Sequence, residues 1–215
     1  MKILVIGGTG NAGHRIAQEA LGRGHSVTLA SRGGGSSPHA GSEGLTSLIL
    51  DSADAEAVTV AAHGHELIVG ATRLAVGREA DIVASTRGLA VGARNARVRL
   101  LVIGGAGPLL VPGTDRLAID DPRWVPSEIR PIATASNQQL EILRKHPDAD
   151  WTYLAPAAHF APGHRTGRYT TADSELVIAS DGSSMISIED YAIALMDLAE
   201  APDERHRVIA VGPSD

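Results

Sequence analysis

A glycine-rich turn stands between a short apolar run and a helical pattern at the start of the chain. The apolar run covers residues 3–6, and the sequence GGTGNAG follows at once as residues 7–13. A continuous apolar run of this length is typical of a strand buried on both faces. The helical pattern covers 11–23, and a second apolar run follows at 27–30. These residues predict a parallel strand–helix–strand unit whose first turn is built from glycine.

The GxxGxxG spacing of this turn predicts a binding place for the phosphates of a dinucleotide. Gly7 permits a tight turn, Gly10 lets a pyrophosphate approach the backbone, and Gly13 lets the helix pack closely on the strand. The free backbone amides and the positive end of the helix dipole would then hold the phosphates. The alternative interpretation is a tight turn that binds nothing.

Apolar runs and helical patterns continue to alternate as far as Pro156. Further strands are expected at 45–50, 67–71, 100–103 and 152–155, helices at 78–94 and 128–146, and loops at 32–44 and 107–126. Ser52 is a candidate cap for the helix that follows the third strand. Beyond Pro156 the expected elements are an irregular loop with a short strand at 163–171, a helix at 187–200 and a last strand at 207–211.

This order of elements predicts an α/β fold of the Rossmann type. Strands that alternate with helices form a doubly wound parallel sheet with helices on both faces. We expect a single NAD(P)-binding domain over 1–215, with a nucleotide-binding core at 1–156. Residues 157–215 would form a small cap on the substrate side, together with the last helix and strand.

The composition limits both the core and the partners. Hydrophobic residues make up 43% of the chain and aromatic residues only 3%, so a core of Val, Ile, Leu and Ala is expected. A net charge of −6 argues against nucleic-acid binding, which requires a basic surface. The absence of cysteine excludes disulfides and thiolate metal sites. No apolar stretch approaches the roughly 18 residues of a membrane span, so we expect a cytoplasmic protein without a membrane partner.

The end of the second strand bears on the choice of cofactor. NAD-specific sites place an acidic residue there, about 20 residues after the glycines. No acid lies between Glu19 and Glu43, and the strand ends in Ser31 and Arg32 instead. An arginine and a hydroxyl suit a 2′-phosphate through charge-assisted hydrogen bonds, which favours NADP(H) over NAD(H). Alternatively, Arg32 is an ordinary solvated residue.

Six segments carry a resemblance to a known family. They are IGGTGNAG, RGHSVTLASR, RLLVIGGAG, DADWTYLAPAAHF, RTGRY and MISIEDYAIALMDLAE. In these segments the chain resembles the atypical short-chain dehydrogenase/reductases. It is most similar to the NADH-flavin reductase group, whose relatives include the NmrA-like and biliverdin reductase B-like proteins.

The resemblance implies where a cofactor would lie along the chain. The implied contacts are Gly7, Thr9, Gly10, Asn11 and Ala12 for the pyrophosphate, Ser31 and Arg32 for the adenosine end, Ala71 and Thr72 for the ribose, Ile103, Gly104 and Gly105 beside the nicotinamide, and Pro156 and Ala157 over it. Asp51 and Ser52, after the third strand, either meet the adenine edge or cap the next helix.

The chain departs from the wider superfamily in its catalytic residues. Most short-chain dehydrogenases use a Tyr-x-x-x-Lys pair to exchange a proton with the substrate oxygen. This chain has two lysines, Lys2 and Lys145, and neither stands four residues after a tyrosine. Alcohol–ketone oxidoreduction and sugar epimerisation by that pair are therefore not expected.

Two residues near the sixth strand are candidates for the substrate side. His159 follows Ala-Pro-Ala-Ala, close to where biliverdin reductase B-like proteins carry a histidine, and could touch the substrate or donate a proton. The alternative is a histidine that is hydrogen-bonded in a loop. Phe160 could stack on a flat acceptor or fill the cap. His63, His65 and Glu66 suggest a solvated turn, and we expect no metal site.

These observations favour an NADPH-dependent reductase of a small conjugated acceptor, flavin-like or quinone-like. Such an acceptor delocalises the charge of a transferred hydride, so solvent can protonate it and a flavin is a possible substrate. One alternative is a regulatory protein that senses NADP(H) without turnover. Another is a biosynthetic isomerase or dehydratase on the same fold. The sequence leaves open whether the chain acts as a monomer or a dimer.

Overall fold

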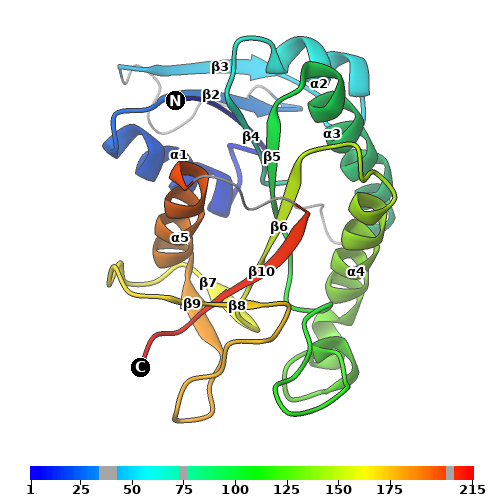
Figure 1. Ribbon diagram of the computed structural model, residues 1–215, viewed down its shortest axis with the longest axis vertical. Coiled ribbons are helices and arrows are strands. Elements are labelled where there is room, and N and C mark those ends of the chain that lie inside the picture. The colour runs from blue at the N-terminus through cyan, green and yellow to red at the C-terminus, as the bar shows by residue number, and fades with distance from the viewer. Residues whose placement is uncertain (34–42, 73–76, 202–205) are drawn as a thin grey trace.

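A mostly parallel sheet runs through the part of the chain that the structure describes, residues 1–33, 43–72, 77–201 and 206–215 of a computed structural model (Figure 1). Its strand order is β3-β2-β1-β4-β5-β6-β10-β8, with β8 antiparallel to β10 and the other neighbours parallel. The strands are β1 (Lys2–Ile6), β2 (Ser26–Ser31), β3 (Leu45–Ile49), β4 (Leu67–Gly70), β5 (Arg99–Ile103), β6 (Trp151–Pro156), β8 (Thr170–Asp173) and β10 (Arg207–Gly212). The expected Rossmann-type sheet is confirmed.

The strand order reverses between β1 and β4. From β1 the chain first proceeds outward to β2 and β3, and then returns to the other side of β1 with β4. Connections that leave neighbouring strands in opposite directions open a crevice beyond their carboxyl ends, where such folds bind ligands. The glycine turn of residues 7–13 follows β1 directly and therefore lies at this crevice.

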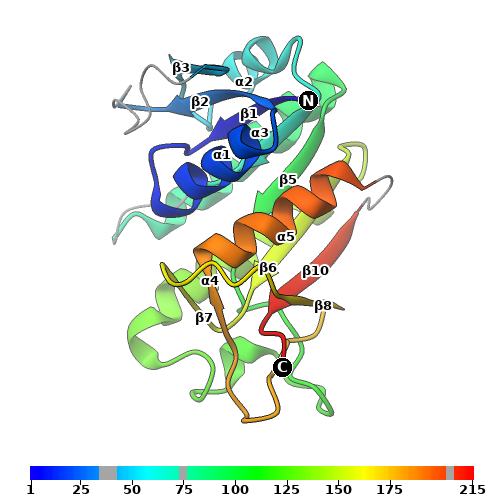
Figure 2. The same cartoon turned by 90° about the vertical axis from the view of Figure 1, so that its left-hand side faces the viewer.

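Helices cover both faces of the sheet (Figures 1 and 2). On one face α1 (Asn11–Gly22) and α5 (Ile188–Glu200) lie side by side, as Figure 2 shows. On the other face are α2 (Ala55–Ala62), α3 (Ile82–Ala96) and α4 (Arg130–Arg144). The side chains of β1 alternate between two cores: Ile3 and Val5 pack with α1 and α5, whereas Leu4 and Ile6 pack on the opposite face.

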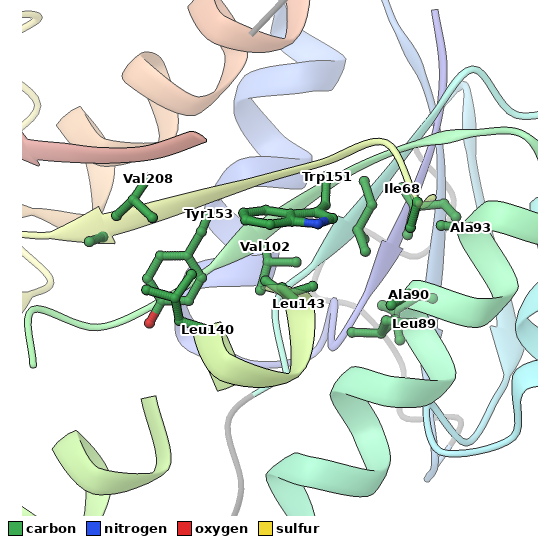
Figure 3. Packing of buried hydrophobic residues seen from close by; sticks show 14 of the residues in the cluster. Ile68, Leu89, Ala90, Ala93, Val102, Leu140, Leu143, Trp151, Tyr153 and Val208 are labelled. Atoms are coloured by element: carbon green, nitrogen blue, oxygen red, sulfur yellow. The ribbon is translucent and has the colours of Figure 1, made fainter. Parts of the chain in front are cut away.

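The core on the α3 and α4 side is mainly aliphatic, as the composition predicts. Figure 3 shows Leu89 of α3 and Leu140 of α4 in the same buried cluster as Val102 of β5. Tyr153 of β6 is also fully buried in this cluster. Among the described residues, none of the helices combines the length and the apolar character of a membrane span.

Several helix boundaries differ from the sequence-based expectation. The helix expected from residue 78 begins as a single 3₁₀ turn, Glu79–Asp81, before α3. The helix expected from 128 likewise begins with a 3₁₀ turn, Ser127–Ile129, and α4 starts at Arg130 with proline in its first turn. The expected loop at 32–44 lies mostly outside the described residues.

The expectation that Ser52 caps α2 is wrong. Asp54 is the N-cap, and its Oδ1 accepts hydrogen bonds from the amides of Glu56 and Ala57 at 3.0 Å. The chain needs one more turn before the helix, because the amide of Asp54 donates to the carbonyl of Asp51 at 3.1 Å. Ser52 therefore lies before the cap, and its side chain is buried.

The C-terminal part contributes more to the sheet than the sequence suggests. Both β8 and β10 join the main sheet, and α5 packs on it. Outside the main sheet, β7 (His159–Ala161) and β9 (Met185–Ser187) form a two-stranded parallel ribbon. Strands of three residues are too short to show an alternating pattern, which is why the sequence did not reveal them.

Two glycines of α3 allow close contact with α2 and with the segment that leads into it. A Cβ at Gly88 would lie 2.1 Å from the carbonyl oxygen of Ser52, and one at Gly92 would lie 2.4 Å from Cγ1 of Val58. The carbonyl oxygen of Ser52 belongs to the backbone, so it cannot rotate away as a side chain could. The packing of α3 at this point therefore depends on glycine.

We expect Gly88→Ala to lower the free energy of unfolding by about 1–3 kcal/mol, because the added methyl group overpacks the contact with Ser52. Gly22→Ala is the control, since a Cβ at Gly22 meets no atom within 4 Å. Alanine there should raise stability by up to about 1 kcal/mol through helix propensity. Urea unfolding of both variants measures the difference, and equal stabilities would contradict the proposed contact.

Candidate cofactor site

The glycine turn after β1 is held against the ends of two neighbouring strands. Gly7 has a φ of +92°, a conformation that favours glycine. A Cβ at Gly7 would lie 2.4 Å from the carbonyl oxygen of Ala71, directly after β4. The amide of Gly7 donates to the carbonyl of Ala30 in β2 at 2.8 Å. The turn is therefore fixed where the strand order reverses.

Gly10 and Gly13 differ in how much space the surrounding protein leaves for a side chain. A Cβ at Gly13 would lie 2.4 Å from the carbonyl oxygen of Gly7, so close packing of helix on turn requires glycine there. At Gly10 the only neighbour within 4 Å is the same oxygen, at 3.3 Å, and its φ of −78° suits any residue. The backbone at Gly10 is thus exposed to solvent, so a ligand can approach it closely.

The N-terminus of α1 fits an anionic group. Its first turn contains no acidic residue, and no side chain caps it from Gly10. Thr9, Gly10 and Asn11 are exposed. The first amides of a helix have no partner within the helix, so those of Asn11 and Ala12 are available to phosphate oxygens, with the helix dipole in their favour. The residues present therefore fit a dinucleotide pyrophosphate.

The other candidate cofactor contacts lie at the carboxyl ends of successive strands. Ser31 and Arg32 end β2, Asp51 and Ser52 follow β3, Ala71 and Thr72 follow β4, Ile103, Gly104 and Gly105 end β5, and Pro156 and Ala157 end β6. Arg32 is exposed, as a residue that meets a phosphate from solvent must be. The fold thus brings all these candidates to one edge, while their contact with a cofactor stays a prediction.

A chain of hydroxyls links two of these strand ends through α3. Ser52 Oγ lies 2.8 Å from Ser85 Oγ, and Ser85 Oγ donates to Thr72 Oγ1 at 3.3 Å. Ser52 and Ser85 are both buried. Sequence reasoning missed Ser85, although a serine on the apolar face of a helix is a signal for a buried polar contact. These bonds hold the segments after β3 and β4 in a fixed relation.

The glycines after β5 have a packing role of their own. The amide of Gly104 donates to the carbonyl of Leu154 at 2.7 Å, which extends the pairing of β5 with β6. A Cβ at Gly104 would lie 2.0 Å from the ring of Tyr153. The amide of Gly105 donates to the Tyr153 hydroxyl at 2.9 Å. Burial raises the pKa of this phenol well above its ordinary value, so it stays neutral.

His159 and Phe160 lie on opposite faces of the β7–β9 ribbon. His159 is exposed, and its amide donates to the carbonyl of Ser184 at 2.9 Å. Phe160 is half-buried and packs on Tyr191, with 4.8 Å between ring centroids. The structure thus leaves the imidazole of His159 open to solvent, whereas Phe160 mainly contributes to the core. Their contact with a substrate stays a prediction.

Charged side chains join helix α1 to the segment after β7. Arg15 of α1 pairs with Glu189 of α5 at 2.5 Å, and Glu189 also accepts from the amide of Gly163 at 2.8 Å. Burial opposes ionisation of Glu189, but the bonds from Arg15 and Gly163 outweigh it and hold its pKa below the ordinary value. Arg165 pairs with Glu19 of α1 at 3.0 Å. These contacts fix the segment beside α1.

Two side chains of the His63, His65 and Glu66 turn bind to residues of β1 and β2. His65 Nε2 lies 2.9 Å from Thr28 Oγ1, and Glu66 accepts from the amide of Lys2 at 2.8 Å. Within the ranges that the structure describes, no group of three or more metal-binding side chains occurs.

Comparisons with known proteins agree with this geometry. The model of the NAD(P)H-binding family matches residues 7–202. YwnB of Bacillus subtilis (strain 168), an uncharacterized protein, is 34% identical over 213 residues, which cover 98% of each chain.

A crystal structure of a "putative epimerase" from Bacteroides thetaiotaomicron is 30% identical, with a TM-score of 0.87 over 100% of this chain and 97% of that one. A "putative NADH-flavin reductase" from Streptococcus pneumoniae TIGR4 is 28% identical, with a TM-score of 0.86 over the whole of both chains.

We expect Gly10→Ala to fold with a stability within about 1 kcal/mol of the wild type, because its backbone conformation suits alanine. Its affinity for a dinucleotide should fall at least about tenfold, since the methyl group stands where the pyrophosphate must approach. Gly13→Ala should instead lose about 1–3 kcal/mol of stability through its contact with Gly7. Calorimetric binding and thermal unfolding distinguish the two, and unchanged binding by Gly10→Ala would contradict the phosphate site.

Proposed function

Because the chain belongs to the NAD(P)H-binding family, we propose that it is a reductase that uses NADPH to reduce a small conjugated acceptor, flavin-like or quinone-like. The main support for the proposal is the open backbone at Gly10. It lies between the turn at Gly7 and the helix at Gly13, which pack tightly on each other. The similarity to a protein named as an NADH-flavin reductase supports a flavin-like acceptor. We propose that the protein acts on small molecules in the cytoplasm.

In this proposal the chain binds and orients the cofactor. The first amides of α1 hold the pyrophosphate, and Ser31 and Arg32 hold the 2′-phosphate beyond β2. Ala71 and Thr72 lie beside the ribose. Bound NADPH supplies a hydride from its nicotinamide ring. The segment after β5 forms one wall beside that ring.

The tyrosines of the chain are poor proton donors for the acceptor. There are three, and two of them, Tyr153 and Tyr191, are fully buried, so burial raises the pKa of each hydroxyl. Burial and a hydrogen bond to Asp197 raise the pKa of Tyr169 to about 12. A conjugated acceptor can take its proton from solvent or from the exposed imidazole of His159. This is why we favour such an acceptor over a simple ketone.

Two alternatives use the same cofactor site without net reduction. The lack of a Tyr-x-x-x-Lys pair favours a protein that binds NADP(H) as a signal and does not turn it over. The similarity to a protein named as an epimerase favours an isomerase or dehydratase. Each alternative predicts NADPH binding without consumption of NADPH by an added acceptor.

We expect the purified protein to oxidise NADPH when flavins or quinones are added, followed at the absorbance band of reduced nicotinamide. Gly10→Ala is the matched control, and its rate should fall at least about tenfold because the pyrophosphate is excluded. Tight NADPH binding without turnover on any flavin or quinone would refute the reductase and leave the two alternatives.

We expect Arg32→Ala to weaken NADPH binding about 10–100-fold, the loss typical of a charge-assisted hydrogen bond of 1.5–3 kcal/mol. Affinity for NADH, which has no 2′-phosphate, should change less than about twofold. Arg144→Ala removes the same charge from the far end of α4 and should leave both affinities unchanged. Equal losses for NADPH and NADH would show that Arg32 does not read the 2′-phosphate.

A further inference from the structure

The hydroxyl of Tyr153 joins the segment after β5 to helix α4. It accepts a hydrogen bond from the amide of Gly105 at 2.9 Å and donates one to the carbonyl of Ser136 in α4 at 3.1 Å. The residue is fully buried. Figure 3 shows its ring directed from β6 toward the turn of α4 that carries Leu140. One phenol thus connects β6, the β5 segment and α4.

The backbone of the β5 segment packs closely against Tyr153 and α4. A Cβ at Gly104 would lie 2.0 Å from Cζ of Tyr153, so the backbone of Gly104 rests on the ring. A Cβ at Gly105 would lie 2.9 Å from Ser136 Oγ. The ring therefore supports the segment from one side, while the hydroxyl holds the next amide in place.

The hydrogen bond also satisfies an amide that the sheet does not pair. The pairing of β5 with β6 ends at Ile103, with one more bond from the amide of Gly104 to the carbonyl of Leu154. Gly105 lies beyond this ladder, where a partly buried amide needs another acceptor. Tyr153 supplies that acceptor and stays neutral, so it can accept and donate at once.

We propose that Tyr153 is a positioning residue for the nicotinamide end of the cofactor. By holding Gly104 and Gly105, it fixes the wall beside which the ring of NADPH must lie for hydride transfer. The inference rests on the proposed function, since it needs a cofactor beside this segment. In superfamily members with the Tyr-x-x-x-Lys pair the tyrosine acts on the substrate, whereas Tyr153 binds backbone only and takes no part in proton transfer.

The test compares NADPH with a fragment that lacks the nicotinamide, 2′-phospho-ADP-ribose. Tyr153→Phe keeps the ring under Gly104 and removes the hydroxyl, which is both the acceptor for the amide of Gly105 and the donor to the carbonyl of Ser136. We expect its affinity for the fragment to stay within about twofold of the wild type. The kcat with a flavin or quinone acceptor, and the affinity for NADPH relative to the fragment, should each fall about 5–20-fold, because errors of position at the reacting ring are costly.

Tyr169→Phe is the matched control. The hydroxyl of Tyr169 donates to the carboxylate of Asp197 in α5 and not to the segment after β5. It should lose stability like Tyr153→Phe but keep the wild-type kcat and affinity ratio within about twofold. Parallel losses in both variants, or an unchanged ratio in Tyr153→Phe, would overturn the positioning role and assign Tyr153 to stability alone.

Amide hydrogen exchange of the wild type tests the role even if Tyr153→Phe does not fold. The amide of Gly105 should exchange slowly in the free protein and more slowly still with NADPH, but not with the fragment. Rapid exchange, or equal protection by both compounds, would overturn the inference. If the wild type binds NADPH without turnover, the proposed reductase activity is refuted. The role of Tyr153 is still decided by the ratio of the affinities for NADPH and for the fragment. A wild type that binds neither compound refutes both.

Discussion

The close approach of Gly7 to the carbonyl of Ala71 is the contact on which the rest of the site depends. It holds the turn after β1 against the end of β4, where the strand order reverses. Gly13 then packs α1 against the same turn, so the amides of the helix N-terminus face the crevice. A side chain at either position would push the helix away from the strand ends. The two positions explain how a backbone without charged side chains can form the proposed phosphate site.

The backbone after β5 packs closely on both Tyr153 and α4. The segment after β5 rests on Tyr153, and Gly107 lies so near α4 that a Cβ there would be 2.6 Å from Asn137 Oδ1. The helix therefore meets the backbone of the β5 segment directly. This arrangement suits an acceptor that needs orientation and a nearby hydride more than it needs a strong acid. The glycines after β5 therefore have a packing role in addition to their predicted place beside the cofactor.

Local chemistry explains where prediction succeeded and where it did not. The buried strands and the glycine turn were predictable because apolar runs and glycine spacing are local signals. Ser52 was misassigned because both Ser52 and Asp54 are good capping residues, and only the turn at Asp51 decides between them. The ribbon of β7 and β9 was missed because the paired residues Phe160 and Ile186 lie 26 positions apart in the sequence, and each strand is too short to carry a pattern.

The sequence by itself determined the fold class, the glycine turn after β1 and the lack of a Tyr-x-x-x-Lys pair, since each depends on residues close together in the chain. Only the tertiary structure decided which groups meet across the sheet. Among these are the hydroxyl chain from Ser52 through Ser85 to Thr72, and the contact of Tyr153 with both Gly105 and Ser136. Such contacts join distant segments, and their partners follow from strand order and side-chain direction. A one-dimensional pattern does not contain that information.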